Sequence, residues 1–164
     1  MFLVTLIFSF FTLQIVSGVL LEFFIASDTS CWIVGPTSTG SCAVIHSGNP
    51  AWATNIPLAK WIWDIDKNTQ AGIATITKFF YVAGIPQSGS LNIAADNYFI
   101  TYLNDVDANC KDSTYGETFK IAEGINCDVN SYIKTGLNKL EIEVNNISTG
   151  DGAVMFKLAV LSNF

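Results

Sequence analysis

The 164-residue sequence contains no arginine, and all eight of its basic residues are lysines. Fourteen acidic residues bring the formal net charge to −6. A nucleic-acid-binding surface needs clustered positive charge, so this composition argues against a nucleic-acid partner. Without arginine the chain also lacks the planar two-pronged donor that suits phosphate and carboxylate ligands. The acidic balance is typical of an ordinary soluble surface.

The familiar motifs of catalysis are also absent. The sequence has no nucleophile elbow, no HExxH, no phosphate-cradling glycine loop and no dinucleotide-binding fingerprint. It has no CxxC, and its one histidine is His46, which argues against a zinc site. The two carboxylates of a glycosidase are paired in space, so sequence does not test for them. We therefore predict a protein that is not an enzyme and has no cofactor.

No stretch after residue 26 has a sustained helical period. Short alternating segments separated by turns rich in glycine and asparagine instead predict an all-β chain, an antiparallel β-sandwich. In the clearest segment Leu140, Ile142 and Val144 alternate with Glu141 and Glu143, which predicts a half-buried strand. A last strand should face inward through Val154, Phe156, Leu158 and Val160. Residues 19–164 are predicted to form one domain.

Residues 90–104, SLNIAADNYFITYLN, are expected to form two strands joined by a tight corner at Asp96-Asn97. Ile73–Val82 is the longest predicted strand. Shorter strands are predicted at Ala59–Trp63, Thr118–Ala122 and Cys127–Ile133.

The N-terminus is almost wholly apolar from Met1 to Val16 and carries no basic residue there. Val16-Ser17-Gly18 follows, with a small residue in the last position and a branched one two before it, so residues 1–18 are predicted to be a signal peptide cleaved after Gly18. The alternative is a retained anchor, because Met1–Leu21 is about long enough to span a bilayer. Either interpretation places the domain outside the cytosol, secreted or at the cell surface.

The sequence has four cysteines, and an even number in a small exported chain indicates disulfides. Three connectivities are possible. The local pairing, Cys31–Cys42 and Cys110–Cys127, is favoured because each pair brackets a loop-like segment. Each closure is expected to be worth about 3 kcal/mol.

Four segments taken in order resemble the galactose-binding-like jelly-roll superfamily: AKWIW, FFYVAG, LNIAADNYFITYLND and YIKTGLNKLEIEVNN, which end at Trp63, Gly84, Asp105 and Asn146. The resemblance implies about eight antiparallel strands in two sheets. Members commonly serve as carbohydrate-binding or adhesion modules, and others are structural. In this family the asparagine at the position of Asn104 is usually followed by glycine. Here Asp105 takes the place of that glycine, which predicts a longer or different turn.

Trp52 is the best candidate for stacking on a sugar, since it lies in a loop bounded by proline and glycine. His46 and Asn49 are close to it in sequence, so the His46–Trp52 loop is the predicted ligand-contact surface. Trp61 and Trp63 are expected in the core instead.

Asp96 and Asn97 could contact a ligand or calcium through side-chain oxygens. The favoured interpretation is a structural corner whose side chains bond nearby backbone amides. The acidic group Asp105, Asp107 and Asp112 could hold calcium as well. It lacks the EF-hand spacing, and a solvated loop is the favoured interpretation.

Asn146-Ile147-Ser148 is an N-glycosylation sequon in a predicted turn, so Asn146 is expected to be accessible.

Three functions follow from these observations. The first is a secreted, non-catalytic binding or adhesion module that recognises carbohydrate. The second is a structural subunit of an extracellular filament, sheath or coat, in which the apolar Val19–Ala26 segment adds to a neighbour's sheet edge. The third is an accessory subunit of a membrane complex, held by an uncleaved N-terminal helix. The expected partners are thus glycans or neighbouring subunits, including other copies of this chain.

Overall fold

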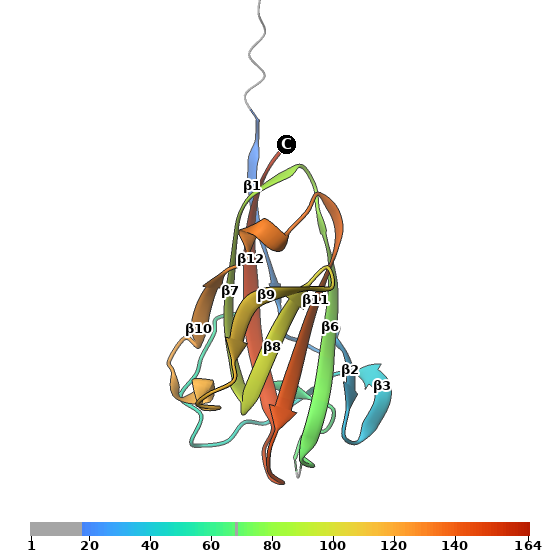
Figure 1. Ribbon diagram of the computed structural model, residues 1–164, viewed down its shortest axis with the longest axis vertical. Helices are drawn as coiled ribbons and strands as arrows, with labels where there is room; N and C mark the ends of the chain where they lie inside the picture. The colour runs from blue at the N-terminus through green and yellow to red at the C-terminus, as the bar shows by residue number, and fades with distance from the viewer. Residues whose placement is uncertain (1–17, 68) are drawn as a thin grey trace, which may run out of the picture.

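The computed structural model describes residues 18–67 and 69–164, which form twelve strands and two three-residue 3₁₀ helices (Figure 1). The strands make two antiparallel sheets that pack face to face, so the predicted β-sandwich is confirmed. The predicted signal peptide falls, apart from Gly18, outside the described residues. Within the described ranges, neither helix has the length or apolarity needed to cross a membrane.

The first sheet has six strands, and β12 runs through its middle. β7 lies along one side of β12, while β1 and β5 share the other side. In spatial order its members are β10 (Ile125–Asp128), β7 (Ile85–Asp96), β12 (Ala153–Asn163), β5 (Ile62–Trp63) and β4 (Val44–Ile45), with β1 (Leu20–Ala26) also paired to β12.

The second sheet also has six strands, and the long pair β6 and β11 forms its centre. In spatial order its members are β3 (Ser38–Cys42), β2 (Trp32–Gly35), β6 (Gly72–Val82), β11 (Gly136–Asn146), β8 (Tyr98–Leu103) and β9 (Val106–Asp112). The corner at Asp96-Asn97 carries the chain from β7 in the first sheet to β8 in the second, as the two-strand interpretation of residues 90–104 predicted.

The main core lies between the sheets and follows the predicted alternation. Leu140, Ile142 and Val144 of β11 are buried, and so are the four predicted inward residues of β12. Glu141 and Glu143 are half-exposed rather than fully exposed, because strands flank β11 on both sides.

A second apolar cluster covers the outer face of the first sheet. Small outward residues of β7 and β12, Ala94 and Ala153, leave room for side chains from outside the sheet. Trp61 and Phe119 fill that space, with Ile56, Ala59 and Met155. Trp61 and Trp63 are thus both buried as predicted, but Trp63 belongs to the main core and Trp61 to the second cluster.

One of the two predicted disulfides forms. Cys110 of β9 and Cys127 of β10 are bonded, with their Cα atoms 5.8 Å apart, and so join the edges of the two sheets. The predicted Cys31–Cys42 bond is wrong, since both thiols are free. Cys42 stands opposite Trp32, and the Ala43 amide donates to the Cys31 carbonyl. Cys31 is therefore one residue away from the position opposite Cys42, and neighbouring residues of a strand face opposite sides of the sheet. The Cys31 side chain thus points into the core and that of Cys42 toward solvent.

Three short elements differ from the sequence prediction. Residues 118–122 contain the 3₁₀ helix η1 (Thr118–Lys120) instead of a strand, because the Thr118 hydroxyl bonds the backbone of Ala95 in place of a strand neighbour. Residues 127–133 hold the end of β10 and the 3₁₀ helix η2 (Asn130–Tyr132). Only Ile62 and Trp63 of the predicted Ala59–Trp63 strand are in a strand.

The turn from β8 to β9 is short, contrary to the expectation drawn from Asp105. Leu103 pairs with Val106, which leaves two turn residues, Asn104 at φ +54° and Asp105 at φ +69°. Two positive φ angles in a two-residue loop make a type I′ hairpin turn, which asparagine and aspartate tolerate. The Asn104 amide nitrogen also donates to Asn138 Oδ1 at 2.9 Å, which ties the turn to β11.

Candidate functional site

Four connecting segments meet at one end of the sandwich, drawn at the bottom of Figure 1. They are residues 46–61, the corner Asp96-Asn97, residues 113–124 and the turn 147–152. This is here called the loop end. At the opposite end of the molecule β1 begins and β12 ends.

Trp52 is half-buried at the loop end and is held on several sides. Its ring lies 4.4 Å from that of Trp61 and 5.0 Å from that of His46, measured between centroids. Its Nε1–H donates to Asp96 Oδ2 at 2.8 Å. Trp52 is therefore a rigid part of the second cluster as well as a surface residue, which the sequence did not indicate.

Asp96 ends β7 and faces the Trp52 indole. Burial raises the pKa of its carboxyl group; the hydrogen bond from Trp52 opposes this rise, and the nearby negative charge of Asp151 adds to it. The carboxyl group thus lies in a partly dry environment in which hydrogen bonds are stronger than in water.

His46 is buried, with 3% of its surface exposed. Its Nδ1 accepts the Gly48 N–H at 3.0 Å, so the proton of the neutral ring is on Nε2, which lies 3.5 Å from Asp151 Oδ1. Burial lowers the pKa of the imidazole, while Asp151 and Asp66 oppose that change. The ring is uncharged at neutral pH, so its contact with Asp151 is polar and is not an ion pair.

Asn49 completes this cluster. Its amide nitrogen donates to Asp151 Oδ2 at 2.7 Å, and its Oδ1 accepts the Ala51 N–H at 2.8 Å. The structure therefore brings together the three predicted contact residues, Trp52, His46 and Asn49, with Asp96. Asp151 was missed, since 102 positions separate it from Asn49 and no local motif marks it.

Asn97 behaves as a corner residue, since its Oδ1 accepts the Ile147 N–H at 3.1 Å and so ties the corner to the 147–152 turn. The Asp96 carboxylate instead accepts its hydrogen bond from a side chain, the Trp52 indole, and not from a backbone amide as the corner interpretation expected.

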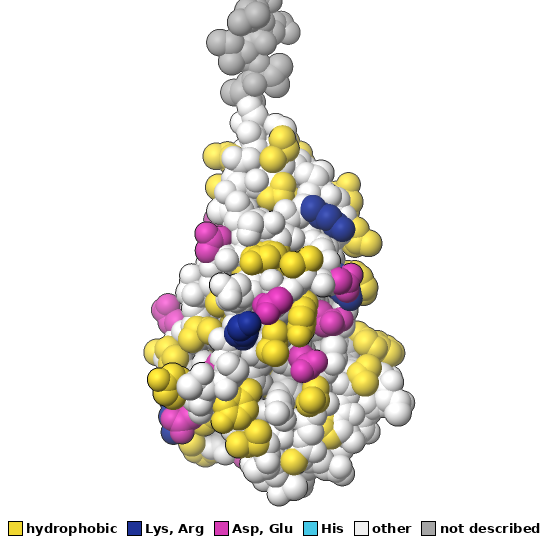
Figure 2. Space-filling model, viewed as in Figure 1, with side chains coloured by type: hydrophobic (Ala, Val, Ile, Leu, Met, Phe, Trp, Pro, Cys, Tyr) yellow, Lys and Arg dark blue, Asp and Glu magenta, His cyan; other side chains and the backbone are white. Residues whose placement is uncertain are grey.

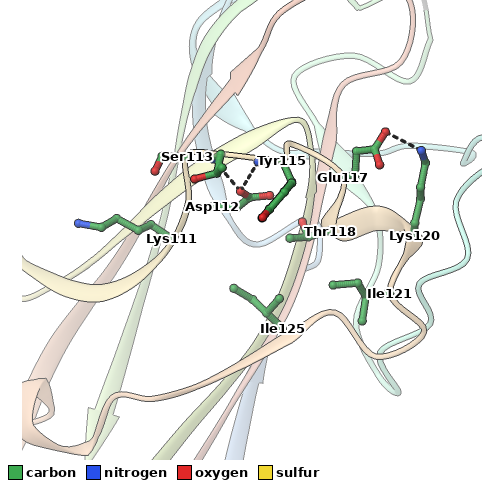
Figure 3. Close-up of a pocket in the computed structure, with 10 residues that line it drawn as sticks. Lys111, Asp112, Ser113, Tyr115, Glu117, Thr118, Lys120, Ile121 and Ile125 are labelled. Carbon is green, nitrogen blue, oxygen red and sulfur yellow. Dashed lines mark hydrogen bonds and ion pairs between the residues drawn. The ribbon is translucent and has the colours of Figure 1, made fainter.

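A hollow of about 530 Å³ opens at the loop end and is lined by residues between Lys111 and Ile125 (Figure 3). Phe119 packs toward Trp52, with 6.5 Å between ring centroids, while Glu117 and Thr118 line the hollow. Its apolar lining comes from Tyr115, Ile121 and Ile125.

Tyr115 is the most exposed of these side chains, at 80%. Its backbone N–H and those of Thr114 and Gly116 donate to the Asp112 carboxylate, which fixes the turn that carries the ring. Lys111 and Lys120 also line the hollow, and each is paired with an acidic residue at the surface. No sequence motif marks Tyr115, because the turn that presents it depends on the buried Asp112.

The acidic groups do not gather into a metal site. Asp105 and Asp112 lie at opposite ends of β9, and Asp105 pairs with Lys139 at 2.5 Å. Across residues 18–67 and 69–164, no group of three or more histidine, cysteine, aspartate or glutamate residues is placed to hold a metal ion.

Asn146 is not an accessible turn residue, contrary to prediction. It is 1% exposed at the end of β11, and its amide nitrogen donates to Thr69 Oγ1 and the Gln70 carbonyl, both at 3.1 Å. The folded domain leaves no room for a glycan on this nitrogen.

No protein-family model matches the sequence, and no curated protein matches it. Among solved structures, the chain is similar to an α-L-rhamnosidase from Streptomyces avermitilis complexed with L-rhamnose, with TM-score 0.53 and 16% identity over 85% of this chain and 12% of that one. It is also similar to an FMN-binding β-glucuronidase from Faecalibacterium prausnitzii, with TM-score 0.51 and 13% identity over 84% of this chain and 22% of that one.

A family 35 carbohydrate-binding module from Clostridium thermocellum aligns with 83% of this chain and 97% of its own, at TM-score 0.49 and 11% identity. The chain spans only about an eighth and about a fifth of the two enzymes. At these identities the two enzyme matches support the fold alone.

Proposed function

We propose that this protein is a secreted, non-catalytic module that binds glycans at the loop end. The observation that carries the proposal is the hollow of about 530 Å³ with the exposed Tyr115 ring at its edge. A hollow of this volume is within the range of small-molecule sites, which combine apolar walls with a few polar groups.

The chemistry of the lining suits a sugar. The flat face of Tyr115 can stack on the C–H face of a pyranose, as Ile121 and Ile125 supply further apolar wall. Glu117, Lys111 and Lys120 are exposed enough to exchange their weak surface pairs for bonds to hydroxyl groups.

The Trp52 cluster supplies a second contact beside the hollow. Asp96 and Asp151 accept hydrogen bonds, while Asn49 and His46 hold Asp151 in place. His46 is buried, so its role is to position this loop and not to touch the glycan. Carboxylates accept hydrogen bonds from hydroxyls and repel anions, which favours neutral saccharides over acidic ones.

Export is supported by the Cys110–Cys127 disulfide, since such bonds persist in oxidising compartments. It agrees with the predicted signal peptide.

A glycan array probed with the full chain tests this proposal, followed by titration with the best-binding saccharide. Tyr115→Ala is expected to weaken binding at least about tenfold, as loss of an aromatic anchor does. Tyr81→Ala is the matched control, because Tyr81 is equally a surface tyrosine, 67% exposed, but lies at the end of β6 far from the loop end. Equal losses in both variants, or an array without any binder, would overturn the proposal.

A second candidate is a structural subunit of an extracellular assembly. The observation that favours it is the outer face of the second sheet, where hydrophobic side chains lie among acidic ones and lysines (Figure 2). Phe79 and Tyr81 of β6 and Leu137 of β11 are each more than 60% exposed there. An assembly subunit would show concentration-dependent association without any glycan.

A further inference from the structure

β1 has a strand on one side only. It pairs with β12 along its whole length, and the described residues provide no strand on its other side. An open edge presents unpaired N–H and C=O groups to any extended chain that approaches it.

The direction of these groups follows from the hydrogen bonds at the two ends of β1. The Val19 carbonyl accepts the Phe164 N–H at 3.1 Å, and the Ser27 N–H donates to the Phe156 carbonyl at 2.9 Å. Backbone groups alternate along an antiparallel strand, so the odd-numbered residues between them also face β12. The backbones of the even-numbered residues, Leu20, Glu22, Phe24 and Ala26, therefore face the open edge.

This edge lacks the features that normally protect one. Protected edges carry lysine, proline or a bulge, whereas β1 carries a single charge, Glu22. Leu20 and Phe24 are 61% and 52% exposed, and Figure 2 shows hydrophobic side chains at this end of the molecule. The edge strand β3 differs, because it is polar, contains Gly40 and shifts register against β2.

We infer that a second copy of this chain covers the edge, with the two β1 strands antiparallel about a two-fold axis. The edge has a definite length, because β1 ends at Ala26 and the next carbonyl, that of Ser27, accepts the Lys60 N–H at 2.9 Å. When Leu20–Ala26 of one copy overlaps fully with the same strand of the other, residue 20 of each copy lies opposite residue 26 of its partner, and residue 22 lies opposite residue 24. These are the residues whose backbones face outward, so the register satisfies the hydrogen-bonding pattern.

The charges also match in this register. Lys157 Nζ lies 5.6 Å from the centre of the Phe24 ring, on the outer face of the sheet. Residues directly opposite each other share a face, so the partner's Glu22 stands beside Phe24 and within reach of Lys157. Symmetry repeats this contact, and Phe23 meets its own copy at the axis. The pairing closes with two copies, as isologous contacts do, and it does not rest on glycan binding.

Sedimentation velocity of the full chain, exported from a secretory host, tests the inference. The expected result is a reversible dimer. Glu22→Lys and Lys157→Glu should each weaken dimerisation about tenfold, because each puts like charges together twice. The double variant should restore the wild-type affinity. A monomer at all concentrations, or single variants that dimerise as the wild type does, would overturn the pairing.

A cross-linking experiment fixes the register. In a Cys42→Ser background, Phe23→Cys should form an intermolecular disulfide on mild oxidation, since its copy lies opposite at the axis. Leu21→Cys is the control and should remain monomeric on a non-reducing gel, because its copy lies four residues further along the paired strands. Cross-linking of Leu21→Cys instead would show another register.

Discussion

At the scale of single residues, Ile142 and Glu141 are neighbours that face opposite sides of β11. Ile142 is fully buried between the sheets, and Glu141 is half-exposed and pairs with Lys139 at 3.2 Å. Ile142→Ala should lower the free energy of unfolding by about 2–5 kcal/mol, the cost of a cavity in a packed core. Glu141→Ala should lower it by less than about 1 kcal/mol. Urea denaturation measures both, and equal losses would contradict the register of β11.

Asp96 should make stability depend on pH. Burial raises the pKa of its carboxyl group, so the folded protein binds that proton more tightly than the unfolded chain. The stability that Asp96 contributes is full below its unfolded pKa, about 3.9, and is lost as pH rises through its higher folded pKa. Asp96→Asn should therefore raise the melting temperature at pH 7, while keeping an acceptor for Trp52, and this gain should shrink as pH falls toward 4.

Asp107→Asn is a control of opposite sign. A hydrogen bond from the Asn109 backbone and one from Lys111 lower the pKa of Asp107. Its contribution is thus present at neutral pH and is lost as pH falls through its low folded pKa. Asp107→Asn should lower the melting temperature at pH 7. A melting temperature that shifts in the same direction for both variants would contradict the assigned environment of Asp96.

Residue-level prediction from sequence succeeded where one local rule decides the outcome. Alternation alone placed Leu140, Ile142 and Val144 in the core. It could not place His46 or Asp151, because their contact joins segments 105 positions apart, 46 to 151. It also failed for Asn146, whose burial depends on Thr69 in a distant turn.

At the scale of elements, the Cys110–Cys127 disulfide joins β9 to β10, the adjacent edge strands of the two sheets. Closing a loop of this size is worth about 3 kcal/mol. Reduction should lower the free energy of unfolding by about that amount in urea denaturation. Cys42→Ser should change it by less than about 0.5 kcal/mol, since that thiol is exposed and unbonded. A reduced protein as stable as the oxidised one would contradict the expected contribution of this disulfide.

Long strands were predictable and short elements were not. β6, β11 and β12 each have eleven residues, so a period of two is repeated often enough to be clear. η1 is set by the contact of one hydroxyl, Thr118, with β7, and no periodic signal marks it. The Cys31–Cys42 prediction relied on the short distance between the two residues along the chain. It failed because the register of β2 and β3 puts their side chains on opposite faces of the sheet.

At the scale of the whole molecule, the two proposed surfaces are centred on different parts of the sandwich. The loop end, with Trp52, Asp96 and the Tyr115 hollow, lies at one end, and β1 begins at the other (Figure 1). β1 runs toward the loop end, and its last residue, Ala26, packs against the same apolar cluster as Trp52. The glycan proposal is tested at Tyr115 and the dimer at Glu22 and Lys157, so the two proposals can fail independently.

The most direct test of glycan recognition at the loop end is an NMR titration of the ¹⁵N-labelled full chain with the best-binding saccharide from the array. We expect amide shift changes in residues 46–54, at Asp96 and Asn97, and in residues 111–125, with β6 and β1 unaffected. Shift changes confined to the outer face of β6 and β11 would contradict this account and place the site on the second sheet.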